Sequence, residues 1–214
     1  IKITCTGINE NKLVYEVLKR IKAEINKRFR KAIPNILREF RFLVKGAIEN
    51  EPTYQAILHG SLRHELGIKN PESVLGRLVT AVINGITLDY KQVLIKGSEL
   101  YAEINIGILA SDLSDVLGKD FAKFISENGK EVPWLKWLLV EGDKFINLKG
   151  YEFIVDPEVV TKSRTHKGIM IQSKRSWRVP PVYSGTESNN FLTRALEDLE
   201  PVIEKIIAQE FQVS

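Results

Sequence analysis

The amino-acid sequence predicts an α+β fold, in which helices at both ends of the chain pack on an antiparallel β-sheet. Residues 1–83 are mainly helical in pattern, because apolar residues recur there at steps of three and four, and residues 188–211 share this pattern. Over residues 86–173 the pattern changes to short apolar segments separated by glycine, as in strands. No repeat and no Gly/Ser-rich linker interrupts the chain. We therefore expect one domain over residues 1–214.

The first expected element is a long amphipathic helix, which Asn9 or Asn11 can cap. Pro34 lacks a backbone donor, so we expect a kink or a split there, although the apolar pattern resumes and continues to Ile48. Two consecutive helices sharing one face would together span about 60 Å at 1.5 Å per residue. A compact domain of this size does not need that length. We therefore expect part of it to contact another molecule.

Further helices are expected over residues 53–66, ending at Gly67, and from Pro71 to Gly85. A hairpin follows, with Gly97 at a turn where a positive φ is favoured. Its strands cover residues 86–95 and 100–108.

The second half of the chain completes the expected sheet. Residues 112–129 predict a short helical insertion, and residues 134–140 fit either a helix or a buried strand. Three further antiparallel strands are expected at 144–148, 151–155 and 168–173. Ser188 or Asn189 can cap the last helix, which Pro201 should bend.

Composition narrows the class of protein. The chain of 214 residues is 43% hydrophobic and 27% charged, which suits one buried core. No apolar run approaches the roughly 18–20 residues of a membrane helix, and nothing resembles a secretory signal, so we expect synthesis in the cytoplasm and no membrane partner. Cys5 is the single cysteine, which excludes disulfides within the chain.

Charge is distributed unevenly along the chain. The window from Lys12 to Lys45 carries eleven basic residues against three acids, a net +8, whereas the window from Glu187 to Glu210 is net −4. Opposite charge at the two ends suits head-to-tail packing of identical subunits. A salt bridge within the monomer explains it equally well.

The sequence offers little support for catalysis. Gly129 followed by Lys130 lacks the upstream glycine and the Ser/Thr of a phosphate-binding loop, and no Gly-x-Ser-x-Gly motif is present. His59 and His64 are five residues apart, about 140° around a helix, and would not converge on a metal ion. We therefore expect no enzyme activity, no cofactor and no metal site.

A basic stripe is the clearest candidate binding surface. Its five residues lie within roughly 40° of one helical line and extend over about 27 Å. They are Lys27, Lys31, Arg38, Arg41 and Lys45. The stripe could follow a phosphate backbone, contact an acidic protein or face solvent. Aromatic residues are not interleaved with it, so recognition of a particular base sequence is not expected.

Four segments carry a resemblance to a known group of proteins. They are 132–139 (VPWLKWLL), 168–181 (GIMIQSKRSWRVPP), 183–186 (YSGT) and 190–196 (NFLTRAL). In these segments the chain resembles the neck, head-to-tail connector and tail-completion proteins of tailed bacteriophages. In that group an amino-terminal helix leads to a segment like 60–63, then to a sheet and a final helix. His59-Gly60-Ser61 departs from the group's pattern of a proline and Thr-Gly, which leaves open which ring of the neck the chain would form.

The resemblance implies a structural protein of the virion, assembled in the host cytoplasm. It implies a homo-oligomeric ring, sixfold or twelvefold, between the portal or adaptor and the tail terminator or tail proteins. Genomic DNA would pass through the lumen without sequence-specific contacts. The alternative from another class is a non-specific nucleic-acid-binding module that uses the basic amino-terminal helices.

Candidate residues for the subunit interface lie late in the chain. They are Arg164, His166, Trp177, Arg178 and Arg194. Simpler explanations exist for several of them: a solvated basic turn for His166, packing on the core for Trp177, and an ion pair with Asp198 in the same helix for Arg194.

Overall fold

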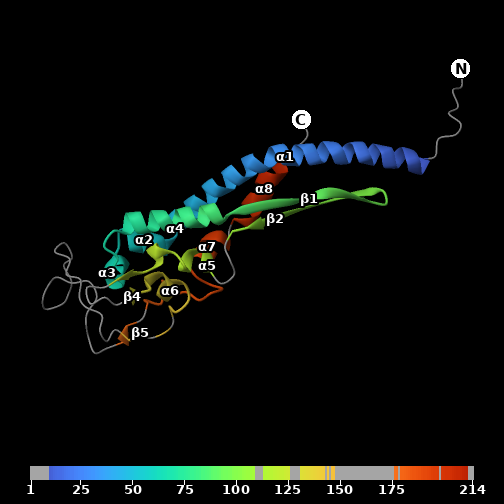
Figure 1. Ribbon diagram of the computed structural model, residues 1–214. Coiled ribbons are helices and arrows are strands. Elements are labelled where there is room, and N and C mark those ends of the chain that lie inside the picture. The colour runs from blue at the N-terminus through green and yellow to red at the C-terminus, as the bar shows by residue number, and fades with distance from the viewer. Residues whose placement is uncertain are drawn as a thin grey trace, which may run out of the picture.

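The first helix, α1 (Glu10–Asn50), is the longest element of the molecule. The computed structural model describes residues 10–108, 113–125, 131–142, 144, 146–147, 176–177, 179–197 and 199–211. Pro34 lies inside α1, so the expected split into two helices is wrong. Figure 1 shows instead that the helix bends about midway along its length. One lost backbone donor does not end the helix, because the buried face on both sides of the proline, from Phe29 to Phe40, is continuous.

Three short helices follow α1. They are α2 (Pro52–Leu58), α3 (Leu62–Leu66) and α4 (Pro71–Gly85). The expected single helix over 53–66 is therefore interrupted. A Cβ on Gly60 would lie 2.8 Å from the backbone oxygen of Ala56, so the turn between α2 and α3 requires glycine. Gly67 ends α3 with φ +74°, and Asn70 caps α4 by accepting a hydrogen bond from the amide of Ser73.

The expected hairpin is confirmed. Strands β1 (Thr87–Lys96) and β2 (Glu99–Gly107) pair antiparallel, with a register shift between Lys91 and Leu94. Gly97 in the turn has φ +62°, the left-handed conformation that glycine adopts most easily. In Figure 1 the hairpin lies alongside the outer part of α1, and together they project from the rest of the molecule.

The helical insertion expected over 112–129 is shorter than predicted. It contains α5 (Ser114–Leu117) and the 3₁₀ turn η1 (Asp120–Ala122), after which β3 (Phe124–Ile125) pairs with β4 (Glu131–Val132). Buried Val116 and Phe121 satisfy the apolar pattern from two separate turns rather than from one helix.

The ambiguous segment after β4 is a helix, α6 (Trp134–Leu139). Five of its six residues are large, apolar and buried, namely Trp134, Leu135, Trp137, Leu138 and Leu139. The indole nitrogen of Trp134 donates to the carbonyl of Phe121 at 2.8 Å. This bond fixes α6 against the 3₁₀ turn.

The expected single sheet is wrong in detail. The described strands form three separate two-stranded antiparallel ladders, the third between β5 (Ile146–Asn147) and β6 (Ser176–Trp177). The expected strands at 151–155 and 168–173 lie outside the described residues.

The carboxy-terminal helix is divided near Pro201, where we expected a bend. Helix α7 (Phe191–Glu197) precedes α8 (Glu200–Phe211). The cap is Asn190 rather than Ser188 or Asn189, because its Oδ1 accepts from the amides of Leu192 and Thr193 at 3.0 and 3.1 Å.

Two apolar clusters hold the elements together. The main core joins the inner part of α1 to α2–α7, with fully buried side chains such as Phe40, Trp134 and Phe191. A smaller cluster of Ala32, Ile36 and Leu88 joins α1 to the hairpin and to α8. Helices from both ends of the chain therefore pack on antiparallel strands, which confirms the predicted α+β class.

Candidate interaction surface

The outer end of α1 exposes a row of apolar side chains. Leu13, Val14, Val17 and Ile21, here called the arm stripe, are 43–53% exposed. Their spacing places them on one flank of the helix. No described residue buries them, whereas Phe29 and Ala32 farther along the same helix are buried. The amphipathic pattern thus continues beyond the part of α1 that this molecule covers.

The hairpin supports the base of this projecting helix. Asn26 Oδ1 accepts a hydrogen bond from the amide of Val93 at 3.1 Å. The rings of Phe29 and Tyr90 stack with centroids 5.2 Å apart, and Arg30 Nε donates to the Tyr90 hydroxyl at 3.2 Å. These contacts join two elements far apart in the sequence. The outer part of α1 and the hairpin therefore form one unit, here called the arm.

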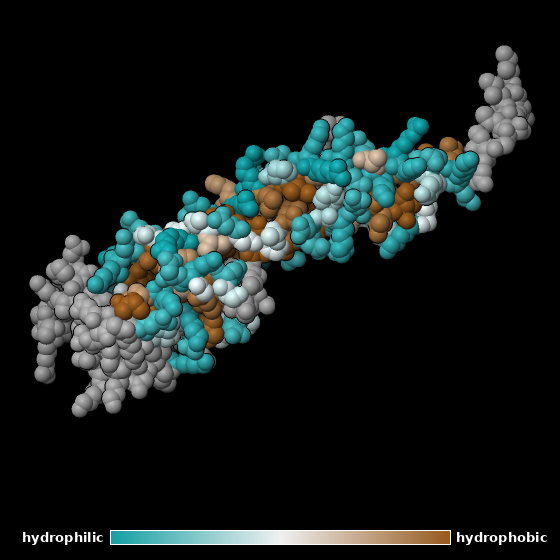
Figure 2. Space-filling model, in the orientation of Figure 1, coloured by the Kyte–Doolittle hydropathy of each residue, from teal (hydrophilic) through white to brown (hydrophobic). Residues whose placement is uncertain are grey.

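Hydrophobic surface is visible on the arm. Figure 2 shows brown residues between teal ones toward the outer end of the molecule, near the grey amino terminus. Leu94 and Tyr101 of the hairpin are also exposed large apolar residues. Exposed apolar rows of this kind, bordered by polar residues, are typical of surfaces that bind another protein.

The five residues of the basic stripe do not form one continuous surface of free positive charge. Lys27 and Lys31 are exposed and form no ion pair with a described residue. Arg38 lies 3.5 Å from Glu39, and Lys45 lies 3.8 Å from Glu49. Arg41 is half-buried, and its Nη2 donates to the carbonyl of Ile86 at 3.5 Å. Lys27 and Lys31 are thus without an ion pair among the described residues. Arg41 instead contacts the start of the hairpin.

The acidic end of the chain is exposed. Glu197, Glu200, Glu204 and Glu210 are exposed, and α8 packs on the small cluster through Ile206 and Ile207. Between α8 and α1, the described residues form no ion pair. The packing of these two oppositely charged helices within one molecule is therefore apolar.

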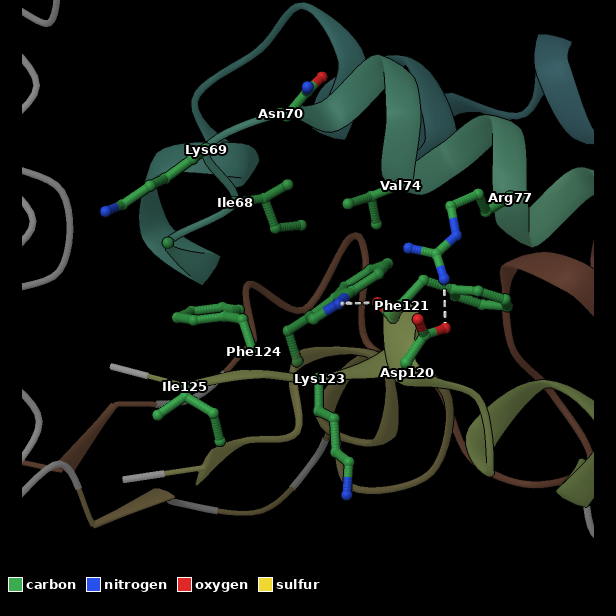
Figure 3. A pocket seen from close by; sticks show the side chains of 12 residues that line it. Ile68, Lys69, Asn70, Val74, Arg77, Asp120, Phe121, Lys123, Phe124 and Ile125 are labelled. Carbon is green, nitrogen blue, oxygen red and sulfur yellow. Dashed lines mark hydrogen bonds and ion pairs between the residues drawn. The ribbon is translucent and has the colours of Figure 1, made fainter. Parts of the chain in front are cut away.

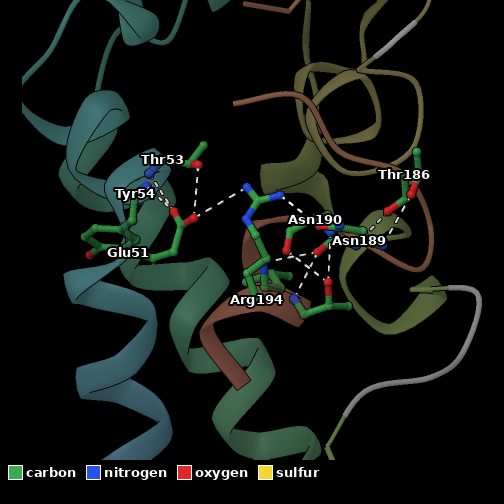
Figure 4. A network of polar contacts seen from close by, with 9 residues as sticks. Glu51, Thr53, Tyr54, Thr186, Asn189, Asn190 and Arg194 are labelled. Carbon is green, nitrogen blue, oxygen red and sulfur yellow. Dashed lines mark hydrogen bonds and ion pairs between the residues drawn. The ribbon is translucent and has the colours of Figure 1, made fainter. Parts of the chain in front are cut away.

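Arg194 lies at the centre of a polar network (Figure 4). Its Nη2 is 3.4 Å from Glu51 Oε1, and its Nη1 donates to Asn189 Oδ1 at 3.1 Å. Glu51 is a buried residue that caps α2, because its Oε2 accepts from the amides of Thr53 and Tyr54. The network joins the carboxy-terminal segment to the end of α1. Asp198, the expected partner of Arg194, lies outside the described residues.

The remaining interface candidates receive no structural test. Arg164, His166 and Arg178 lie outside the described residues. Trp177 belongs to β6, of which only the backbone is described. Their place in a subunit interface stays a prediction.

A cavity of about 300 Å³ lies between the start of α4 and the 3₁₀ turn (Figure 3). Apolar side chains, among them Ile68, Val74 and Phe121, form much of its lining. Three of the four charged residues that line it are in ion pairs, Arg77 with Asp120 and Lys123 with Glu131 at 2.7 Å, whereas Lys69 forms none with a described residue. The hydrogen bond from Arg77 holds the pKa of Asp120 below its usual range. The cavity can admit an apolar group, but it presents no acid/base pair aimed at one point.

The described part of the chain contains neither a cluster of metal ligands nor a helix that could span a membrane. No group of three or more His, Cys, Asp or Glu side chains there could hold a metal ion. No helix there is both long enough and apolar enough to span a bilayer.

Comparison with known proteins gives no further guidance. Neither the protein-family models, nor the curated proteins, nor the solved structures contain a match to this chain.

The arm could be only partly predicted from the sequence. The uninterrupted apolar periodicity of α1 indicated surplus apolar surface. That Tyr90 and Val93 hold the helix at its base could not be foreseen, because these contacts span 60 and 67 residues of sequence.

Proposed function

We propose that this chain is a structural assembly protein that forms a ring in the neck of a tailed-bacteriophage particle, between the head and the tail. The ring seals the joint and surrounds the path of the DNA. Its location is the virion, and it assembles in the host cytoplasm.

The projecting arm carries this proposal. Leu13, Val14, Val17 and Ile21 present apolar surface that the described remainder of the molecule leaves exposed. Burial of such surface against another protein is favourable by about 25 cal/mol per Å². Exposed apolar surface of this kind is typical of a protein that assembles with other copies or partners.

The order of elements agrees with what the resemblance implies. A long helix comes first, antiparallel strands follow, and α7 begins at Phe191, where the segment 190–196 resembles the final helix of neck proteins. This agreement supports the placement in the neck, which the arm alone does not specify.

The test is the oligomeric state of the purified protein. Sedimentation over increasing protein concentration should reveal a closed ring, and electron microscopy should show sixfold or twelvefold particles with a channel wide enough for duplex DNA. A molecule that stays monomeric up to millimolar concentration, or that ends as a two-fold dimer, would contradict the proposal. A ring whose channel is too narrow for DNA would contradict the neck assignment.

A double variant tests whether ring formation depends on the arm. We expect Val17→Ser combined with Ile21→Ser to weaken association at least tenfold, because it removes apolar surface from the arm stripe. Phe42→Ser is a matched control, since Phe42 also lies on α1 and is 74% exposed but does not belong to the arm stripe.

The nucleic-acid alternative predicts a different result. Its supporting observation is that Lys27 and Lys31 are exposed and form no ion pair with a described residue. A monomer that binds random duplex DNA with strong salt dependence, without ring formation, would favour the alternative over the ring.

A further inference from the structure

We infer that the arm of one copy docks on the acidic outer surface of α7 and α8 of a neighbouring copy. This surface, here called the acidic face, consists of the exposed carboxylates Glu197, Glu200 and Glu204. The inference rests on the proposed function, since it names the partner surface for the same arm.

Charge on the arm selects the partner. Lys19 and Arg20 lie within the segment that carries the arm stripe, and both are exposed and without an ion pair among described residues. Lys27 and Lys31 continue this unpaired positive charge toward the base of the arm. Contact between two arms would place these cations against like charges, which is unfavourable. The arm therefore requires a partner of negative charge.

The acidic face has the matching composition. Glu200 and Glu204 are four residues apart and thus lie on the same side of α8. Glu197 at the end of α7 adds a third exposed carboxylate. None of the three is paired with a described residue. Among the described residues, the arm and the acidic face thus carry unpaired charges of opposite sign.

The distance along α1 prevents the arm stripe from docking on the acidic face of its own molecule. Helix α8 packs on α1 at Ala32 and Ile36, whereas the arm stripe ends at Ile21. The eleven or more residues between them correspond to about 16 Å or more along a rigid helix. Figure 1 shows that the outer part of α1 extends away from α7 and the start of α8, so the acidic face that the arm meets belongs to another copy.

A contact between two different surfaces has a consequence for symmetry. Each copy uses its arm on one side and its acidic face on the other, so copies add head to tail and close into a ring if the rotation permits. An arm-to-arm contact would instead stop at a two-fold dimer. The docking of arm on acidic face is therefore the contact that a ring requires.

The experiment reverses charge on each surface separately. The arm variant carries Lys19→Glu, Arg20→Glu and Lys27→Glu, and the acidic-face variant carries Glu197→Lys, Glu200→Lys and Glu204→Lys. Sedimentation at low salt should show that each variant alone associates at least tenfold more weakly than the original protein. Mixed in equal amounts, the two variants should associate again, because every arm then meets an acidic face of opposite charge. An alternating ring of this kind closes for six or twelve copies.

Controls reverse exposed charges on the body of the molecule. Lys119→Glu and Glu72→Lys lie outside both surfaces and should leave association unchanged. Since all the substituted side chains are exposed, circular dichroism should show unaltered helix content.

The outcomes separate this inference from the proposed function. If both variants form rings as the original protein does, the docking assignment is wrong and the ring uses another surface. If each variant fails alone and the mixture also fails, the acidic face is not the partner of the arm. If the original protein forms no ring at all, the proposed function is wrong and this inference with it.

Discussion

Two arginines that the sequence places on charged surfaces have partners inside the molecule. Arg41 belongs to the basic stripe by its helical position, yet it donates to the carbonyl of Ile86 at the start of the hairpin. Arg194 contacts Glu51, a residue 143 positions away in the sequence. A long flexible side chain reaches whatever acceptor the fold brings near, so helical spacing alone does not determine its partner.

At Asp120 the structure predicts a dependence of stability on pH. The hydrogen bond from the Arg77 guanidinium lowers the pKa of Asp120 in the folded protein. The folded state therefore favours the ionised carboxylate. The resulting stabilisation is present above the ordinary Asp pKa of about 3.9 and is lost as pH falls through the lowered folded value.

Asp120→Asn tests this dependence. Urea unfolding should show a lower free energy of unfolding for the variant than for the original protein at pH 6, because the charged pair with Arg77 is lost. The difference should shrink as the pH is lowered below 4. The effect is small, because both side chains are at least half exposed. A difference that is constant from pH 6 to pH 2.5 would contradict the assignment.

Among the elements, α7 depends most clearly on a single residue. Asn190 is fully buried, and its Oδ1 accepts from the amides of Leu192 and Thr193. Its Nδ2 donates to the carbonyls of Thr186 and Glu187. The side chain therefore starts the helix and holds the preceding loop against it.

Asn190→Ala should lower the free energy of unfolding by about 1–3 kcal/mol, because it removes the cap of α7 and the hydrogen bonds from Nδ2 to the carbonyls of Thr186 and Glu187. Chemical denaturation measures the change. Ser188→Ala is the matched control: Ser188 is exposed, and the substitution should cost no more than about 0.5 kcal/mol. Equal effects of the two substitutions would mean that the cap lies elsewhere.

At the scale of the whole molecule, the arm and the remainder of the molecule, here called the body, have different roles. The body contains the main core, from Phe40 to Phe191, whereas the arm stripe contributes no buried residue. Removal of the outer arm should therefore affect association much more than folding.

Deletion of residues 1–21 tests this division. We expect the free energy of unfolding to change by no more than about 1 kcal/mol, because none of the removed apolar side chains that the structure describes is buried. Sedimentation should show that self-association is lost. Deletion of residues 1–33 is the contrasting variant, since it also removes buried Phe29 and Ala32 and should destabilise the fold. Marked destabilisation by the shorter deletion would show that the arm belongs to the core.

Local chemistry determined much of this structure from the sequence alone. The left-handed turns at Gly67 and Gly97, the start of α4 at Pro71 and the long periodicity of α1 all follow from the residues themselves and their near neighbours. The α+β class and the opposite charges of the two ends followed from the same patterns.

Only the tertiary structure determined how much of the apolar face of α1 is buried. Its apolar residues from Leu13 to Ile48 have one periodicity, but Phe29, Ala32, Ile36, Phe40, Val44 and Ile48 are buried and those of the arm stripe are not. The difference arises because both the hairpin and α8 pack on the helix near Ala32 and Ile36, whereas, of the described elements, only the hairpin lies alongside its outer part. Whether an apolar side chain of a helix is buried depends on which distant segments pack against it. The periodicity within the helix does not contain that information.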